Sequence, residues 1–184
     1  MSEILFDADG IEDALGRMAE ALCGARADGP FAVVGIRTGG EFLAQRLAAL
    51  IEKRREQKPP LGVVDVTLYR DDGFGPQEWP RVGVTHIPFR LKEYTVVLVD
   101  DVLYTGRTVR AALDAILDYG RPKAVRLAVL VDRGLRELPI GADVVGFTVA
   151  TTAADHVDVR LRAAGNASDA VLVNKVGAGT EGAP

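Results

Sequence analysis

The sequence is poor in cysteine and histidine, and it has no long hydrophobic run. Its single cysteine, Cys23, cannot form a disulfide within the chain, and its place on an apolar helical stripe favours a buried structural thiol. The two histidines, His86 and His156, have no partner at metal-ligand spacing, which favours ordinary surface or loop histidines. No apolar run approaches the roughly 20 residues of a membrane helix, and the acidic start MSEILFDADG is unlike a secretory signal. We therefore expect a cytoplasmic protein.

Charge and motif content exclude or disfavour two further classes. The formal net charge is −4, whereas nucleic-acid binders usually carry a basic face. The basic run Lys53 to Arg55 lies near the C-terminal end of a predicted helix and complements its dipole, which favours a solvated helix end over a nucleic-acid patch. The P-loop pattern GxxxxGK[ST] does not occur, which excludes a P-loop kinase. With 184 residues, 48% hydrophobic and 26% charged, the chain fits one globular domain.

Apolar periodicity predicts strands and helices in alternation. Alternation at this spacing is typical of an α/β fold with a mainly parallel sheet covered by helices on both faces. We expect one domain over residues 1–176 and a disordered tail over 177–184. The expected helices are 8–26 (with Asp9 as N-cap), 41–56 and 107–117, and the expected strands are 30–36, 62–69, 96–99, 124–132, a short stretch at 144–145, and two edge strands near 157–162 and 170–174.

The most informative stretch is VVLVDDVLYTGRT, residues 96–108. Four apolar residues run into Asp100 and Asp101, and a short loop leads from these acids to a helical pattern. In an open α/β sheet this loop lies at the carboxyl end of a strand, where free N–H groups at a helix N-terminus hold anions. Carboxylates accept hydrogen bonds from vicinal hydroxyls but repel phosphate, so the order predicts a sugar phosphate, with its diol on the acids and its phosphate in the loop. The alternative is an ordinary turn in which the acids only cap a helix.

A second stretch, Arg37-Thr38-Gly39-Gly40, also joins a predicted strand to a helix and offers a guanidinium and backbone donors. By itself it is equally typical of a structural Gly-Gly turn. A third, Arg70-Asp71-Asp72, opens a Gly/Pro-rich loop that contains Trp79. Such a long loop in a compact domain favours a functional lid, with Trp79 either shielding the site or packing the loop. A solvated turn is the alternative for its acids.

Residues 96–108 resemble the phosphoribosyl-diphosphate (PRPP) signature of the type I phosphoribosyltransferases. More narrowly, residues 99–143, with GIRTGGEFLAQRL (35–47) and DVTLYRDD (65–72), are similar to the PyrR family of pyrimidine-operon regulators, which are also uracil phosphoribosyltransferases. The resemblance implies a type I phosphoribosyltransferase fold with a small hood at about residues 133–148. It also implies conversion of uracil and PRPP to UMP and diphosphate, magnesium held largely by PRPP, and a homodimer or homotetramer.

The resemblance further implies a role for each matched position. Catalysis would involve Asp100, Asp101 and Arg70, and magnesium would meet Asp71 or Asp72. PRPP and the base would contact three segments, namely Asp100, Asp101, Val102, Leu103, Tyr104, Thr105, Gly106, Arg107 and Thr108; Arg37, Thr38, Gly39 and Gly40; and Val131, Asp132 and Arg133.

The chain departs from the family pattern at several positions. Gly39 stands where the family loop KTRG has an arginine, which removes one diphosphate contact. Tyr104 stands near the place where purine-salvage relatives carry an acid, which disfavours a purine. The family binds an attenuator RNA through basic residues, and this chain offers Arg17, Arg133 and Arg136. Four expected basic or histidine positions are replaced, by Glu20, Leu135, Gly141 and Phe147.

These losses favour the enzyme over the RNA regulator. The alternatives are an RNA-binding attenuation regulator of the pyr leader, with UMP as ligand and little turnover, and a catalytically idle module that binds UMP.

Overall fold

The computed structural model describes residues 2–24, 29–70 and 83–175. Its main layer is a five-stranded, all-parallel sheet in the order β3-β2-β4-β5-β6. The strands span Leu61–Val64 (β3), Phe31–Ile36 (β2), Thr95–Leu103 (β4), Ala124–Asp132 (β5) and Val144–Thr148 (β6). The expected α/β fold with a mainly parallel sheet is confirmed.

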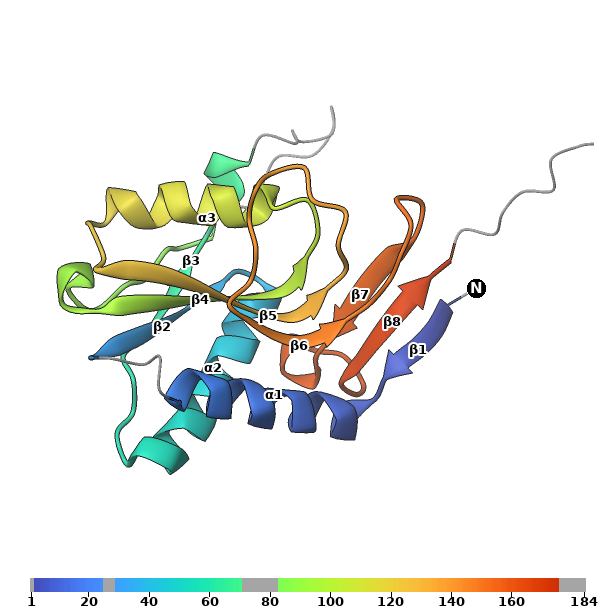
Figure 1. Ribbon diagram of the computed structural model, residues 1–184, viewed down its shortest axis with the longest axis horizontal. Coiled ribbons are helices and arrows are strands. Elements are labelled where there is room, and N and C mark those ends of the chain that lie inside the picture. Colours follow the sequence, from blue (N-terminus) through green and yellow to red (C-terminus); the bar gives the residue numbers. More distant parts are fainter. Residues whose placement is uncertain (1, 25–28, 71–82, 176–184) are drawn as a thin grey trace, which may run out of the picture.

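Helices cover both faces of this sheet (Figure 1). Helices α1 (Ala8–Cys23) and α2 (Gly39–Arg55) pack on one face, and α3 (Arg107–Asp118) packs on the other. Strand β4 shows why its sequence is apolar without interruption: Val97 and Val99 belong to the core under α1 and α2, while Val96 and Leu98 belong to the core under α3. A strand buried on both faces holds its carboxyl end rigidly.

Three short strands form a second, antiparallel sheet in the order β1-β8-β7. They span Ser2–Phe6 (β1), Ala170–Asn174 (β8) and His156–Arg160 (β7), and Figure 1 shows this sheet beyond the β6 edge of the main sheet. Of the two edge strands expected near 157–162 and 170–174, β7 lies at an edge of this sheet, but β8 is central, because it pairs with both β7 and β1. The sequence did not predict β1. Phe6 on β1 stacks on Phe147 on β6 at a centroid distance of 3.6 Å and thereby links the two sheets.

Two local predictions also need correction. Helix α1 is capped by Asp7, whose Oδ1 accepts a 3.0 Å hydrogen bond from Gly10 N. Asp9 lies two residues further along the chain, within the first turn of the helix. The strand expected over 62–69 stops at Val64. The carboxylate of Asp65 then accepts hydrogen bonds from Thr67 N (3.0 Å) and Gly83 N (3.1 Å), which turns the chain into a short 3₁₀ helix, η1 (Thr67–Tyr69).

Several expectations fall on residues outside the described ranges. These are the magnesium ligands Asp71 and Asp72, Trp79 in the long loop, and the tail over 177–184. Two further 3₁₀ turns, η2 (Leu91–Glu93) and η3 (Arg162–Ala164), complete the elements that the structure describes. None of the helices in the described part of the chain combines the length and hydrophobicity needed to cross a membrane.

Candidate active site

The acid pair lies at the carboxyl end of β4, inside the strand rather than after it. Asp100 is 5% exposed, and its Oδ1 accepts a 3.0 Å hydrogen bond from Asp101 N. Asp101 is more open, and its Oδ1 accepts from Val102 N at 2.8 Å. Each carboxyl group is therefore fixed by the backbone of the next residue, which leaves its second oxygen for another partner.

Burial raises the pKa of Asp100 well above its usual value, and the neighbouring Asp101 carboxylate raises it further. The positive charge of Arg70 lowers the pKa of Asp100 only in part. Burial raises the pKa of Asp101 too, although the hydrogen bond from Val102 N opposes the rise. The charge of Asp158 on β7 adds to the rise, so the second sheet faces this site. The two carboxyl groups are therefore harder to ionise together than two separate acids would be.

Replacement of Asp100 by asparagine is expected to stabilise the ligand-free protein. A raised carboxyl pKa means that the folded state binds more protons than the unfolded state, so wild-type stability falls as pH rises from the ordinary carboxyl pKa through the folded one. Asparagine mimics the protonated acid and should raise the free energy of unfolding by about 1 kcal/mol or more at about pH 8. Urea unfolding should show that this gain disappears towards about pH 3. A gain that is equal at both pH values would contradict the assigned pKa direction.

The loop after β4 wraps around a cavity of about 330 Å³. Gly106 adopts φ 94°, a left-handed conformation that favours glycine, and α3 begins at the next residue. Gly106, at the N-cap, has no side chain to cap this helix start, and Arg107 N donates a long 3.4 Å hydrogen bond to Thr105 Oγ1. Backbone N–H groups at such a helix start can bind an anion. The cavity is lined by residues 102–109, Arg70 and Glu137. The structure thus places the predicted phosphate loop and Arg70 around one cavity.

The predicted diphosphate loop, Arg37 to Gly40, meets the acid pair directly. A Cβ added to Gly39 would lie 2.1 Å from Asp101 Oδ2, and one added to Gly40 would lie 2.3 Å from Val99 O. The start of α2 therefore touches the end of β4 through two positions that have no side chain. The Arg37–Thr38 peptide bond is cis, and the Arg37 guanidinium lies 3.5 Å from the Glu41 carboxylate.

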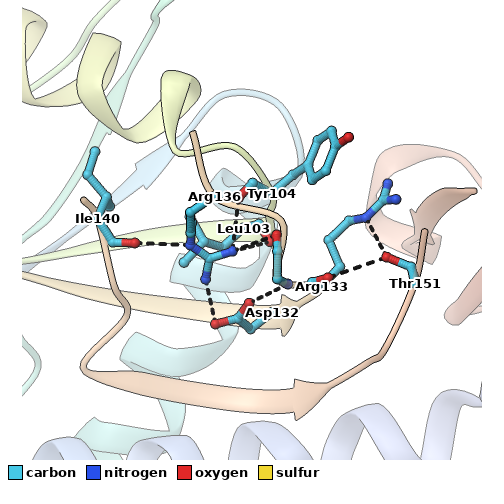
Figure 2. A network of polar contacts seen from close by, with 8 residues as sticks. Leu103, Tyr104, Asp132, Arg133, Arg136, Ile140 and Thr151 are labelled. Atoms are coloured by element: carbon cyan, nitrogen blue, oxygen red, sulfur yellow. Dashed lines mark hydrogen bonds and ion pairs between the residues drawn. The ribbon is translucent and has the colours of Figure 1, made fainter. Parts of the chain in front are cut away.

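The base-binding segment that the sequence predicted, Val131 to Arg133, has three different environments. Val131 is fully buried in the core, so only its backbone could meet a ligand. Arg133 is 5% exposed: its Nε donates to Thr151 Oγ1 at 3.0 Å, and its guanidinium lies 4.2 Å from the ring centroid of Tyr104 (Figure 2). Partial burial raises the pKa of Asp132, but hydrogen bonds from Arg136 and Gly134 N lower it overall.

Arg136 organises this region, and the sequence did not identify that role. Its guanidinium donates to four carbonyl oxygens and pairs with Asp132 at 2.6 Å (Figure 2). The carbonyls belong to Leu103 (3.4 Å), Tyr104 (2.9 Å), Gly134 (2.9 Å) and Ile140 (3.0 Å). The segment after β5 is thereby tied to the phosphate loop. In the sequence, the family resemblance indicates Arg136 only as a cation for RNA binding.

Arg133 and Arg136 had also been offered as part of an RNA-binding face. Both guanidinium groups bind acceptors within the protein, and Arg133 is almost fully buried. Arg17 on α1 donates a 3.4 Å hydrogen bond to Gly146 O on β6. Phe147, at a position where the family commonly has a lysine, stacks on Phe6 and contributes to the core.

Comparisons with known proteins agree with this geometry. The family model "Phosphoribosyl transferase domain" matches residues 1–164. The "Bifunctional protein PyrR" of Syntrophobacter fumaroxidans is 49% identical over 162 residues, which cover 88% of this chain and 87% of that protein. The protein of the same name from Pelotomaculum thermopropionicum is 51% identical over 159 residues, covering 86% and 88%.

Solved structures resemble the fold at low sequence identity. A hypoxanthine-guanine phosphoribosyltransferase from Bacillus anthracis has a TM-score of 0.62 at 17% identity and covers 80% of this chain and 82% of its own. The hypoxanthine phosphoribosyl transferase of Trypanosoma cruzi has a TM-score of 0.65 at 17% identity and covers 83% and 80%. These similarities confirm the expected phosphoribosyltransferase fold. The family model and the two PyrR relatives show that the chain belongs to the PyrR family of phosphoribosyltransferases.

Proposed function

We propose that this protein transfers the phosphoribosyl group of PRPP to uracil and so forms UMP and diphosphate. One observation carries the proposal: the acid pair stands between two loops that can hold anions. On one side is the cavity of about 330 Å³ around residues 102–109. On the other is Gly39, close enough to Asp101 that no side chain fits between them. A ribose with a phosphate at one end and a diphosphate at the other matches this order.

In the proposed reaction the bond between the anomeric carbon and the diphosphate oxygen breaks while N1 of uracil forms the new bond. Positive charge develops on the ribose, and the proton of N1 leaves to water or to a nearby acceptor. The carboxyl groups of Asp100 and Asp101 accept hydrogen bonds from the ribose hydroxyls and face the positive charge that develops on the ribose. The N–H groups at the start of α3 hold the 5′-phosphate, and Arg37 offers its guanidinium to the diphosphate. Position and charge supply most of the rate enhancement.

Magnesium fits this site as an ion that the substrate brings with it. Within the described ranges, no group of three or more His, Cys, Asp or Glu side chains could hold a metal ion. Magnesium commonly keeps several waters and uses one or two carboxylates together with substrate phosphates. We therefore propose that the diphosphate of PRPP holds it and that Asp71 or Asp72 contributes. When bound, the ion would offset the negative charge of the leaving group.

The choice of uracil is supported by family membership and by Tyr104. This residue lies under the buried Arg133 guanidinium at 4.2 Å and supplies a phenol where the purine relatives supply an acid. In the segment from Val131 to Arg133, the backbone groups are then the proposed contacts to the base. Equal turnover of hypoxanthine and uracil with PRPP would contradict the assignment.

A second candidate function is UMP-dependent regulation of pyrimidine genes through the pyr leader RNA, and the relatives' designation as bifunctional favours it. The internal use of Arg133 and Arg136 removes two cations from the surface that would bind RNA. We therefore place catalysis first, in a cytoplasmic homodimer or homotetramer. RNA binding without turnover would reverse this order.

A paired assay tests both functions on one preparation. We expect UMP to form only when uracil and PRPP are both present, and we expect weak retention of a pyr leader RNA in a gel shift with or without UMP. Absence of turnover would refute the enzyme proposal. Tight RNA binding that depends on UMP would show that the regulatory function is retained.

A further inference from the structure

The cavity assigned to the 5′-phosphate contains an acid that the reaction does not need. Glu137 lines this cavity, and its Oε2 accepts a 2.6 Å hydrogen bond from Nε of Arg107 in the phosphate loop. A carboxylate in a phosphate site opposes the binding of a dianion, because like charges in close proximity repel even in water. The position of Glu137 therefore works against the ligand.

Backbone contacts hold Glu137 in this place independently of its side chain. The N–H groups of Glu137 and Leu138 donate to Thr105 O at 3.0 and 3.1 Å. The preceding Arg136 ties the same segment to the carbonyls of Leu103 and Tyr104 (Figure 2). A Cβ added to Gly106 would lie 3.4 Å from Leu138 Cβ, so the segment also packs closely on the loop. The carboxylate is therefore carried to the cavity by the fold.

The ion pair has little value for stability. The side chains of Arg107 and Glu137 are 41% and 51% exposed, and pairs this exposed contribute from nothing to about 1 kcal/mol. Glu137 would thus hold Arg107 away from the phosphate without a matching gain in folding. We therefore expect the Glu137–Arg107 pair to affect ligand binding and not folding.

We propose that Glu137 competes with the 5′-phosphate for Arg107 and so weakens the binding of PRPP and UMP. This inference rests on the proposed function, because it takes the cavity at residues 102–109 as the phosphate site. When the phosphate enters, Arg107 exchanges its carboxylate partner for a phosphate oxygen. The carboxylate keeps product affinity low, which suits an enzyme that must release UMP after each turnover.

The test is the affinity of Glu137→Gln for UMP, measured by calorimetry at low ionic strength. We expect the Kd for UMP to fall about five- to tenfold, because the amide no longer holds Arg107 or repels the phosphate. The Kd for uridine, which has no phosphate, should not change. The gain should shrink as salt is added. Asp114→Asn is the matched control, because it makes the same charge change on an exposed Asp114–Arg110 pair (2.7 Å) of α3 outside the cavity lining.

A double-mutant comparison tests the competition itself. In an Arg107→Gln background, Glu137→Gln should no longer tighten UMP binding. An equal gain in both backgrounds would show general repulsion and overturn the competition. If the wild-type protein binds UMP and Glu137→Gln binds it equally or more weakly, the inference is wrong while the proposed function stands. If the wild type binds neither UMP nor PRPP, the proposed function itself fails.

Discussion

Replacement of Asp101 by asparagine is expected to lower kcat/KM for UMP formation by about 10²- to 10³-fold, the usual effect of removing one electrostatic contact to a transition state. Asp101 Oδ1 accepts from Val102 N at 2.8 Å, and an asparagine oxygen can keep this bond. The second oxygen, Oδ2, faces Gly39, and the NH₂ group that replaces it in asparagine has nearly the same size. The variant therefore loses charge while keeping shape.

Steady-state kinetics with varied PRPP measure this loss. Because the carboxylate faces a charge that develops only in the transition state, kcat should fall more than the KM for PRPP rises. Asp9→Asn is a suitable control, since Asp9 is an exposed acid in the first turn of α1. If Asp101→Asn retains full activity, the acid pair has no part in the mechanism.

The parts of the fold that could be predicted are those whose signals are local. Strand β4 and helix α3 follow one another within residues 95–118, and the apolar run and the helical spacing are both read without knowing any distant contact. The second sheet is different, because β1 pairs with β8 at the other end of the chain. SEILF alternates weakly and is only partly buried, so no local pattern announces a strand.

The same distinction applies to the site. The position of the loop that we propose for the phosphate could be predicted from its sequence, because strand, acids, glycine and helix follow in order. The contact of Gly39 with Asp101 could not, because it depends on β2 and β4 lying side by side. Glu137 was also missed, since only the fold brings it to Arg107. Residue order within one segment predicts which loop is a candidate for anion binding, but charges that other segments bring to that loop cannot be read from it.

Replacement of Gly40 by alanine is expected to destabilise the protein by about 3 kcal/mol or more, at the upper end of the range for overpacking. The added Cβ would lie 2.3 Å from Val99 O and 3.0 Å from Asp100 Cα, both of which are backbone atoms. These atoms belong to β4, which is fixed on both sides by its pairing with β2 and β5, so the strand cannot move aside. The start of α2 must retreat instead, and it takes Arg37 and Thr38 away from the acid pair.

Activity should therefore be lost along with stability. Measurement of the KM for PRPP distinguishes the loss of activity from the loss of stability. At a temperature where the variant remains folded, the KM for PRPP should rise strongly, because the diphosphate loop no longer meets Asp101. Gly16→Ala is the matched control: it lies within α1, its added Cβ meets no atom within 4 Å, and alanine in a helix should stabilise by about 0.5 to 1 kcal/mol. Urea unfolding compares the two variants directly. Equal stability of both would mean that α2 does not depend on close approach to β4, and the two anion-binding loops would then not be held together by this contact.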